Sequence, residues 1–366
     1  MHQSVSDLVQ LILLYAVIHI ICLLFWNGFE ASVAGMFIDL RYILYFALVY
    51  ATLKLFPQYR QYFIRVGFAG AVVVLLFAVL QVFVLPHDIL RHIGYSAQTI
   101  TPYLTVDLNY DFVRINSTLR GPNPLGAYAG IVLAIIAAAV VRGKLTPDKK
   151  RIGIALLLTL AAAVALWASY SRSAAGAAVI MIAIVLVIGL HHLLSRRVWI
   201  VSAIVAFALL GGLFAIRDSS FVSNVILHEN PNGGSVEKSN DGHVDSLYDG
   251  TARMVRQPFG AGIGSTGSAS LGTDQPLIIE NQYLFIAHET GWAGLAVFVG
   301  LFGLILRRLW YRRSDWLALG AFASGIGLAA IGLLLPVWVD DTVSVIWWGL
   351  AAVALTGGVY GKRTRK

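Results

Sequence analysis

The chain has 366 residues, of which 58% are hydrophobic and only 13% are charged, and its formal net charge is +8. Soluble domains carry about 45–50% apolar and about 25% charged residues, so this composition excludes an ordinary soluble protein. The positive charge does not indicate nucleic-acid binding, because the basic residues lie in short connectors between apolar runs, as in the cytoplasmic loops of membrane proteins. A single cysteine, Cys22, excludes an intrachain disulfide.

Long apolar runs predict the fold class. A helix that crosses a hydrocarbon core of about 30 Å needs about 20 apolar residues, and its backbone groups must be paired within the helix. Such runs lie at 8–26, 32–55, 63–85, 123–141, 152–170, 174–194, 198–216, 281–306, 316–336 and 343–360. We therefore predict an all-α, polytopic bundle of about ten transmembrane helices, forming one integral membrane domain over 1–366. The first run lacks a basic leading segment, so no cleavable signal peptide is expected.

The distribution of Lys and Arg predicts the orientation. With both termini in the cytoplasm, most of the 27 basic residues fall in short inner connectors. Two long connectors, 86–122 and 217–280, then lie outside the cell. Connectors of this length are usually functional or disordered. The second is expected to contain an amphipathic helix from His243 to Gln257, ended by Pro258.

Six arginines on the predicted outer side run against the positive-inside bias, which indicates another demand on them. Guanidinium groups bind phosphate through parallel hydrogen bonds and keep their charge, so such a set suits a diphosphate at the membrane surface. The set comprises Arg114, Arg120, Arg172, Arg217, Arg253 and Arg256. The alternative is that these residues contact lipid headgroups or pair with Asp107, Asp111, Asp218 or Asp249.

Two of these arginines lie in short motifs at predicted helix ends. Arg172 falls in a very tight turn between the fifth and sixth spans. Arg120 lies just before the fourth span, where Asn123 is the expected N-cap and Pro124 the first helical residue.

Candidate acids and bases lie at the start of the eighth span. Glu280 at the interface is a possible general acid or base, or a carboxylate favoured by the helix dipole. Asn281 follows it, and His288 and Glu289 lie two turns further in, where ionisable groups are functional hypotheses by default. His288 has the alternative of bonding a neighbouring helix, and His243 that of a solvated loop histidine.

Two further features have structural interpretations. Asp39 and Arg41 in the second span are expected to be a structural pair or interface groups. The motif Gly262-Ile-Gly264-Ser-Thr-Gly267 matches a dinucleotide fingerprint, but it does not lie between a strand and a helix of a βαβ unit. We expect a tight glycine turn that folds the loop back onto the bundle, with backbone amides able to form an anion nest.

Four stretches in this order resemble the O-antigen ligase and O-antigen polymerase superfamily of bacterial membrane glycosyltransferases. They are 114–126 with its ending Gly-Pro-Asn-Pro-Leu-Gly, 171–176, 243–264 and 280–294. The resemblance implies a helical bundle of the GT-C type that needs no metal or other cofactor. It also implies that Arg172 and Arg120 face the diphosphate of an undecaprenyl-diphosphate-linked glycan, with Arg253 and Arg256 on the loop helix.

One departure from the family pattern affects the expected activity. The ligases have a histidine before the Asn of the late span, whereas this chain has Glu280, which looks more like the polymerases. We therefore expect a polymerase in the bacterial plasma membrane, with Glu280 or His243 as base. Its partners would be the lipid-linked donor, a glycan or lipid acceptor, membrane lipids and other polysaccharide-assembly proteins. A ligase that acts on a lipid A core or a protein is the alternative, and a non-enzymatic transporter of the same lipid is the second.

Overall fold

The structure is a computed structural model that describes residues 2–25, 27–106, 109–144, 148–191 and 236–357. Its internal contacts divide the chain into two compact units. Unit 1 comprises Met1–Phe68 and Asp241–Lys366, and unit 2 comprises Ala69–Asn240. Each unit is described by itself.

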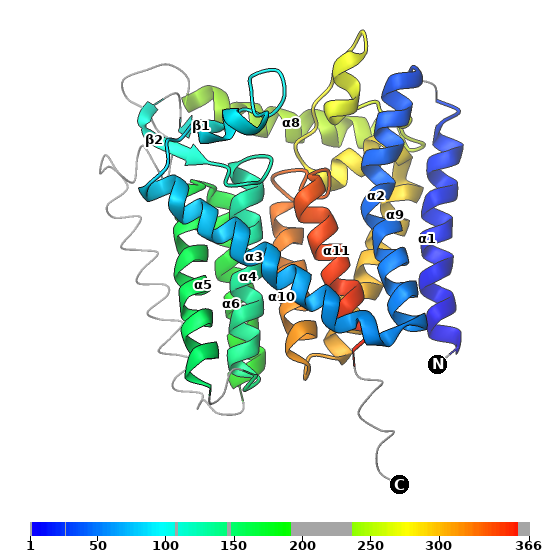
Figure 1. Ribbon diagram of the computed structural model, residues 1–366. Coiled ribbons are helices and arrows are strands. Elements are labelled where there is room, and N and C mark those ends of the chain that lie inside the picture. Colours follow the sequence, from blue (N-terminus) through cyan, green and yellow to red (C-terminus); the bar gives the residue numbers. More distant parts are fainter. Residues whose placement is uncertain (1, 26, 107–108, 145–147, 192–235, 358–366) are drawn as a thin grey trace. The chain divides into compact units, whose positions relative to one another are not determined.

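Helices account for most of the described part (Figure 1). Nine of the ten predicted spans coincide with a helix there, and the run 198–216 lies outside the described residues. These helices are α1 (His2–Cys22), α2 (Phe29–Leu55), α3 (Arg60–Phe83), α4 (Pro122–Val141), α5 (Lys149–Ala168), α6 (Arg172–Leu190), α9 (Gln282–Tyr311), α10 (Trp316–Ile331) and α11 (Asp341–Leu355).

Six of the described helical segments are long and apolar enough to cross a membrane: α2, the continuous stretch Pro57–Phe83, α4, α5, α6 and α9. Three apolar helical stretches are shorter: Asp7–Cys22 of α1, α10 and α11. The protein is therefore a helical, multi-pass membrane protein. The count of ten spans and the placement of the long connectors outside the cell stay predictions.

Unit 1 is built from the pairs α1 with α9 and α2 with α11, and α10 packs on both α9 and α11. An aromatic cluster fills its centre, where the indole rings of Trp338, Trp347 and Trp348 meet Phe302. Because a buried indole N–H needs an acceptor, Trp347 Nε1 donates to the backbone oxygen of Ala321 at 3.0 Å. The cluster joins α9, α11 and the connector before α11.

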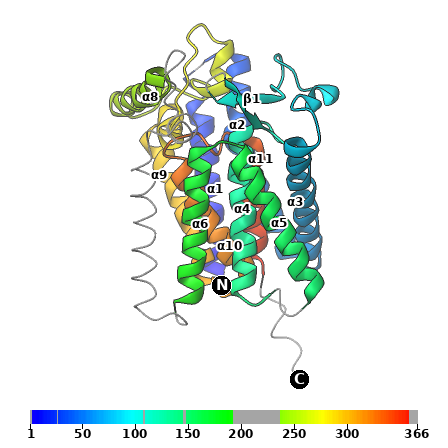
Figure 2. The ribbon, with the colours of Figure 1, turned by 90° about the vertical axis from the view of Figure 1, so that its left-hand side faces the viewer.

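Unit 2 places α4 between α5 and α6 (Figure 2). Small residues allow the close approach of α4 and α6, as is common between membrane helices. A Cβ atom on Gly126 would lie 2.7 Å from Ser169 Oγ and 2.8 Å from Ala174 Cβ. Gly126 therefore fixes how near the start of α4 lies to the turn between α5 and α6.

The connector between α3 and α4 contains a short helix, η2 (Ile89–Ile93), and an antiparallel hairpin of β1 (Tyr103–Val106) and β2 (Asn109–Ile115). Tyr103 pairs with Ile115, and Leu104 pairs with Arg114. Ser117, in the left-handed region with φ 51°, anchors the chain after β2. Its N–H donates to Gln81 Oε1 at 2.9 Å, and its Oγ donates to the backbone oxygen of Val74 at 2.6 Å. The hairpin was not foreseen from the sequence.

The amphipathic helix predicted over 243–257 is α8 (Val236–Arg256), which ends where expected before Pro258 but begins seven residues earlier. Gly250 and Met254 face α9, and Met254 packs against Ile279, Leu284 and Phe285. The apolar stripe of α8 thus covers the start of α9.

Candidate active site

The predicted site residues fall in both units. Arg114, Arg120 and Arg172 lie in unit 2, whereas Arg253, Arg256, Glu280, Asn281 and His288 lie in unit 1. Arg217 lies outside the described residues. His243 lies within α8, but its side chain is outside the described part.

The tight turn predicted before Arg172 is confirmed. α5 ends at Ala168, and Ser171 is the N-cap of α6, so Arg172 is the first residue of the next helix. Tyr170 takes the left-handed conformation with φ 46°, which reverses the chain within three residues. Arg172 is exposed at this turn, and Arg120 is exposed just before α4.

Arg114 holds this turn in place. Its Nε donates to the backbone oxygen of Ser169 at 2.9 Å, and its Nη2 donates to Asn123 Oδ1 at 2.7 Å. β2, the turn before α6 and the first turn of α4 are therefore joined by one guanidinium group. The prediction that Asn123 caps α4 is wrong, because its side chain accepts from Arg114 while α4 already begins at Pro122 after Gly121.

In unit 1, Asn281 and Gln282 anchor the start of α9. Asn281 is its N-cap, with Oδ1 accepting from the N–H groups of Tyr283 at 2.9 Å and Leu284 at 3.0 Å. Its Nδ2 donates to the backbone oxygen of Leu333 at 2.8 Å. The backbone N–H of Gln282 donates to the oxygen of Gly332 at 2.8 Å. Asn281 is thus a structural cap that binds α9 to the end of α10.

Glu280 comes directly before this cap and is half-buried. Its backbone N–H donates to Ser246 Oγ of α8 at 3.3 Å, so Glu280 lies where α8 meets α9. A second hydrogen bond joins α8 to α9, because Trp292 Nε1 donates to the backbone oxygen of Met254 at 2.7 Å.

The arginines of α8 have different surroundings. Arg253 Nε lies 2.6 Å from Asp249 Oδ2, so the alternative of pairing with an acidic residue is realised for this arginine. Arg256, one turn further along the helix, is exposed. His288 of α9 is only 2% exposed. The charges of Arg253 and Asp249 on α8 interact with it electrostatically. The Nδ1 of His288 has no hydrogen-bond partner among the described residues.

The glycine motif forms the tight turn expected from the sequence. Gly262, Gly264 and Gly267 all have positive φ, at 93°, 79° and 68°. A Cβ on Gly262 would collide with the backbone oxygen of Phe25, and one on Gly264 with that of Ala31. The Nδ2 of Asn27 donates to the backbone oxygens of Ala261 at 3.0 Å and Ile263 at 3.2 Å. The motif therefore packs against the connection between α1 and α2 and forms no βαβ turn.

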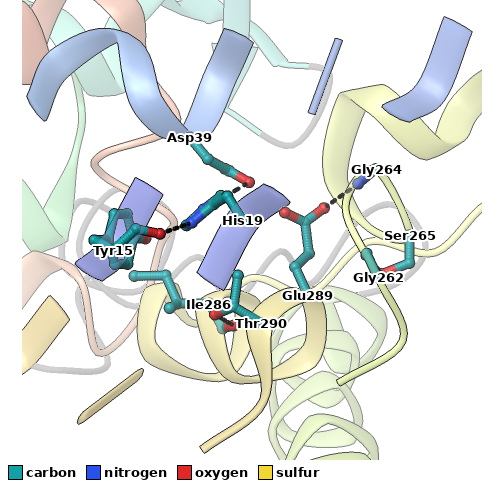
Figure 3. A network of polar contacts seen from close by, with 9 residues as sticks. All are labelled: Tyr15, His19, Asp39, Gly262, Gly264, Ser265, Ile286, Glu289 and Thr290. Atoms are coloured by element: carbon teal, nitrogen blue, oxygen red, sulfur yellow. Dashed lines mark hydrogen bonds and ion pairs between the residues drawn. The ribbon is translucent and has the colours of Figure 1, made fainter. Parts of the chain in front are cut away.

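The turn binds a side-chain oxygen of the protein itself. The N–H of Gly264 donates to Glu289 Oε1 at 3.0 Å, as Figure 3 shows. Sequence reasoning marked Glu289 only as an ionisable group at span depth. The glycine turn was also predicted. Its contact with Glu289 was not, because the two residues lie 25 positions apart and no repeating sequence pattern indicates such a contact.

Asp39 and Arg41 do not pair with each other. Asp39 Oδ2 lies 3.7 Å from His19 Nε2 of α1 (Figure 3), whereas Arg41 Nη2 donates to the backbone oxygen of Val339. His19 Nδ1 lies 2.8 Å from the backbone oxygen of Tyr15, one turn earlier. The ionisable groups of α2 are thus tied to α1 and to the connector before α11.

Comparison with known families identifies the segment that carries these groups. Residues 155–299 match the O-antigen ligase family model. The matched segment contains Arg172, both arginines of α8, the glycine motif and the start of α9. The resemblance to the O-antigen ligase and polymerase superfamily is thereby confirmed. No curated protein matches the chain.

Proposed function

We propose that this O-antigen ligase-type protein is a membrane glycosyltransferase that polymerises glycan units carried on undecaprenyl diphosphate at the outer face of the bacterial plasma membrane. The observation that carries this proposal is the family match over 155–299, because that segment holds Arg172, Arg253, Arg256 and Glu280. Arg172 and Arg256 are exposed, as a contact with a lipid-linked diphosphate requires.

The arginines would act on the leaving group. In the transfer, the bond between the anomeric carbon of the donor and the diphosphate oxygen breaks, and negative charge develops on the diphosphate. Guanidinium groups already in place stabilise that charge without rearranging in the transition state. Arg172, Arg120 and Arg256 are the donors proposed for this role.

Glu280 is the proposed general base, with His243 as the second candidate. The carboxylate takes the proton of the acceptor hydroxyl while that oxygen forms the new bond to the anomeric carbon. A single displacement gives inversion at this carbon. The Asn281 cap fixes the backbone at Glu280, and Ser246 of α8 contacts it, so the base and the arginines of α8 are held by one junction.

Single substitutions test the assignment. We expect Arg172→Ala, Arg120→Ala and Glu280→Gln each to lower transfer at least about tenfold, measured as shorter glycan chains in cells and as turnover by purified protein. Arg91→Ala is the control, because Arg91 forms only an exposed pair with Asp88 in the same connector as Arg120. Unchanged chain length at normal protein levels in all three variants would sink the assignment.

The product distinguishes the alternatives. The family description names ligase activity, which would give glycan joined to a lipid A core or to a protein. Longer polyprenyl-linked glycan supports the polymerase instead. A transporter of the same lipid predicts movement between two compartments and no turnover in detergent, so new glycosidic bonds formed by detergent-purified protein would exclude it.

A further inference from the structure

The segment 258–264, called the glycine segment below, crosses an interruption in α9. Gly291 breaks the helix with φ 68° and ψ −172°. On one side of the break, the N–H groups of Ala261 and Gly262 donate to the backbone oxygens of His288 at 2.6 Å and Glu289 at 3.2 Å. On the other side, the N–H of Trp292 donates to the oxygen of Pro258 at 2.9 Å. The segment thus supplies the hydrogen bonds that a continuous helix would make to itself.

The side chain of Glu289 adds a further contact at this crossing. Glu289 is the last residue but one before the break, it is 1% exposed, and its Oε1 accepts from Gly264 N–H at 3.0 Å. An ionisable group at membrane depth is costly, so its retention indicates a demand beyond packing. The side chain of Glu289 reaches Gly264 at the C-terminal end of the segment, whereas the backbone oxygens of α9 accept from Ala261 and Gly262.

The second oxygen of Glu289 lies on the side of His19 and Asp39 (Figure 3). Its neighbour there is the carboxyl group of Asp39, and Asp39 in turn contacts His19. Tyr15 of α1 and Tyr42 of α2 lie close enough to both carboxyl groups to feel their charge. Glu289 Oε2, Asp39 Oδ2 and His19 Nε2 have no hydrogen-bond partner among the described residues. Glu289 therefore joins the glycine segment to α1 and α2 at the level of the break.

The segment follows the end of α8 closely in the chain. Only Gln257 separates Arg256 from Pro258, and the N–H of Gln257 still donates to the oxygen of Arg253 at 2.8 Å. The chain has no slack there to absorb a shift of the segment. A shift at Gly264 would be passed to Pro258 and then to the guanidinium groups of the last turn of α8.

We propose that Glu289 is a positioning residue: by accepting the N–H of Gly264, it holds the glycine segment at the break of α9 and so positions Arg256 of α8 for the donor diphosphate. This role presupposes the glycan transfer proposed above. Glu289 touches no reacting atom in it. It acts through the arginine that stabilises the leaving diphosphate, so its loss lowers kcat/KM for the lipid-linked donor.

Glu289→Leu and Glu289→Gln separate the hydrogen bond from the volume of the side chain. The glutamine keeps an acceptor for Gly264 N–H, whereas the leucine of similar size has none. We expect Glu289→Leu to lower kcat/KM for the donor about tenfold, and Glu289→Gln to keep a kcat/KM close to that of the unsubstituted protein. Glu30→Leu is the matched control, because Glu30 is an exposed carboxylate in the first turn of α2.

A double-mutant cycle tells positioning from general destabilisation. If Glu289 acts through α8, Glu289→Leu has little further effect on kcat/KM for the donor once Arg256→Ala is present. Additive effects, within about 0.5 kcal/mol, would overturn the proposal. A glutamine variant whose kcat/KM for the donor falls about tenfold below that of the unsubstituted protein would overturn it as well, whether or not the leucine variant folds.

Hydrogen exchange tests the contact without any activity. The amides of 261–264 should exchange faster in Glu289→Leu than in Glu289→Gln, while the amides of α10 and α11 keep their protection in both. Absence of transfer by the unsubstituted protein would refute the proposed function and leave this exchange result to decide whether Glu289 holds the segment. Normal transfer with equal exchange in both variants would refute the role of Glu289 alone.

Discussion

The turn before α6 in unit 2 and the glycine segment in unit 1 are each held in place by one ionisable side chain, an arginine in unit 2 and a glutamate in unit 1. In unit 2, the guanidinium of Arg114 donates to a backbone oxygen and an amide oxygen, and so fixes a three-residue turn. In unit 1, the carboxyl group of Glu289 accepts from a backbone N–H and fixes a segment that crosses a broken helix. The first arrangement needs one residue with positive φ, Tyr170, whereas the second needs several glycines in contact with backbone.

The two regions differ in how well they can accommodate a substitution. At the Arg114 turn, side chains make the contacts, and side chains can adjust. At the break of α9, backbone meets backbone. A Cβ on Gly260 would lie 2.7 Å from the oxygen of Glu289, and one on Gly291 would lie 2.6 Å from the carbonyl carbon of Phe259. Close-packed backbone has no rotamer to change, so substitutions there must move the whole segment.

The largest expected effect is at the break itself. Gly291→Ala places a methyl group in a left-handed conformation against the backbone of 258–259, and we expect the free energy of unfolding to fall by about 3 kcal/mol or more. Thermal unfolding in detergent measures it. Gly300→Ala in the same helix is the control, because no atom lies within 4 Å of its Cβ position. A Gly291→Ala protein as stable as the control would show that the segment moves freely and would break the comparison.

An intermediate effect is expected at Arg114. Arg114→Ala leaves the oxygen of Ser169 and the side chain of Asn123 without this donor, and we expect a loss of about 2 kcal/mol in unfolding free energy. Activity should fall further, because Arg172 follows the turn. Arg91→Ala, which removes an exposed pair, should cost less than about 0.5 kcal/mol. Equal losses in the two variants would mean that Arg114 does not hold the turn.

The smallest effect is expected at the cap of α9. Asn281→Ala removes the oxygen that accepts from Tyr283 and Leu284, and we expect a loss of about 1 kcal/mol. Asn281→Asp keeps that oxygen but loses the donor to Leu333, so it separates capping from the tie to α10. If the aspartate variant is as unstable as the alanine variant, the tie to Leu333 matters more than the cap.

Much of this fold follows from the sequence because apolar runs and helix ends are local signals. The tight turn before Arg172, the end of α8 before Pro258 and the glycine turn at 262–267 were all predicted from a few neighbouring residues. The hairpin after η2 was missed, since β1 has only four residues and sits in a connector. The cap of α4 was misplaced because Asn123 is drawn to Arg114, nine residues away.

The candidate site was only partly accessible to the same reasoning. Positive-inside bias singled out the arginines, and the motif at 280 located the start of α9. Charge statistics do not reveal which arginine is already engaged, and the structure gives Arg114 and Arg253 protein partners. The role of Glu289 depends on Gly264 and on Asp39, which lies 250 residues earlier in the chain, so no local pattern could indicate it.

The bonds of Asn27 also determine an order of events during synthesis. Asn27 is separated by 234 and 236 residues from the backbone oxygens it binds at Ala261 and Ile263. Every residue of unit 2 is made in that interval. As the chain leaves the ribosome, unit 2 can therefore complete its contacts first, while α1 and α2 wait in the bilayer for the glycine segment. A chain that stopped at residue 240 would contain all residues of unit 2. It would lack Ala261 and Ile263, which bind Asn27 in the connection between α1 and α2.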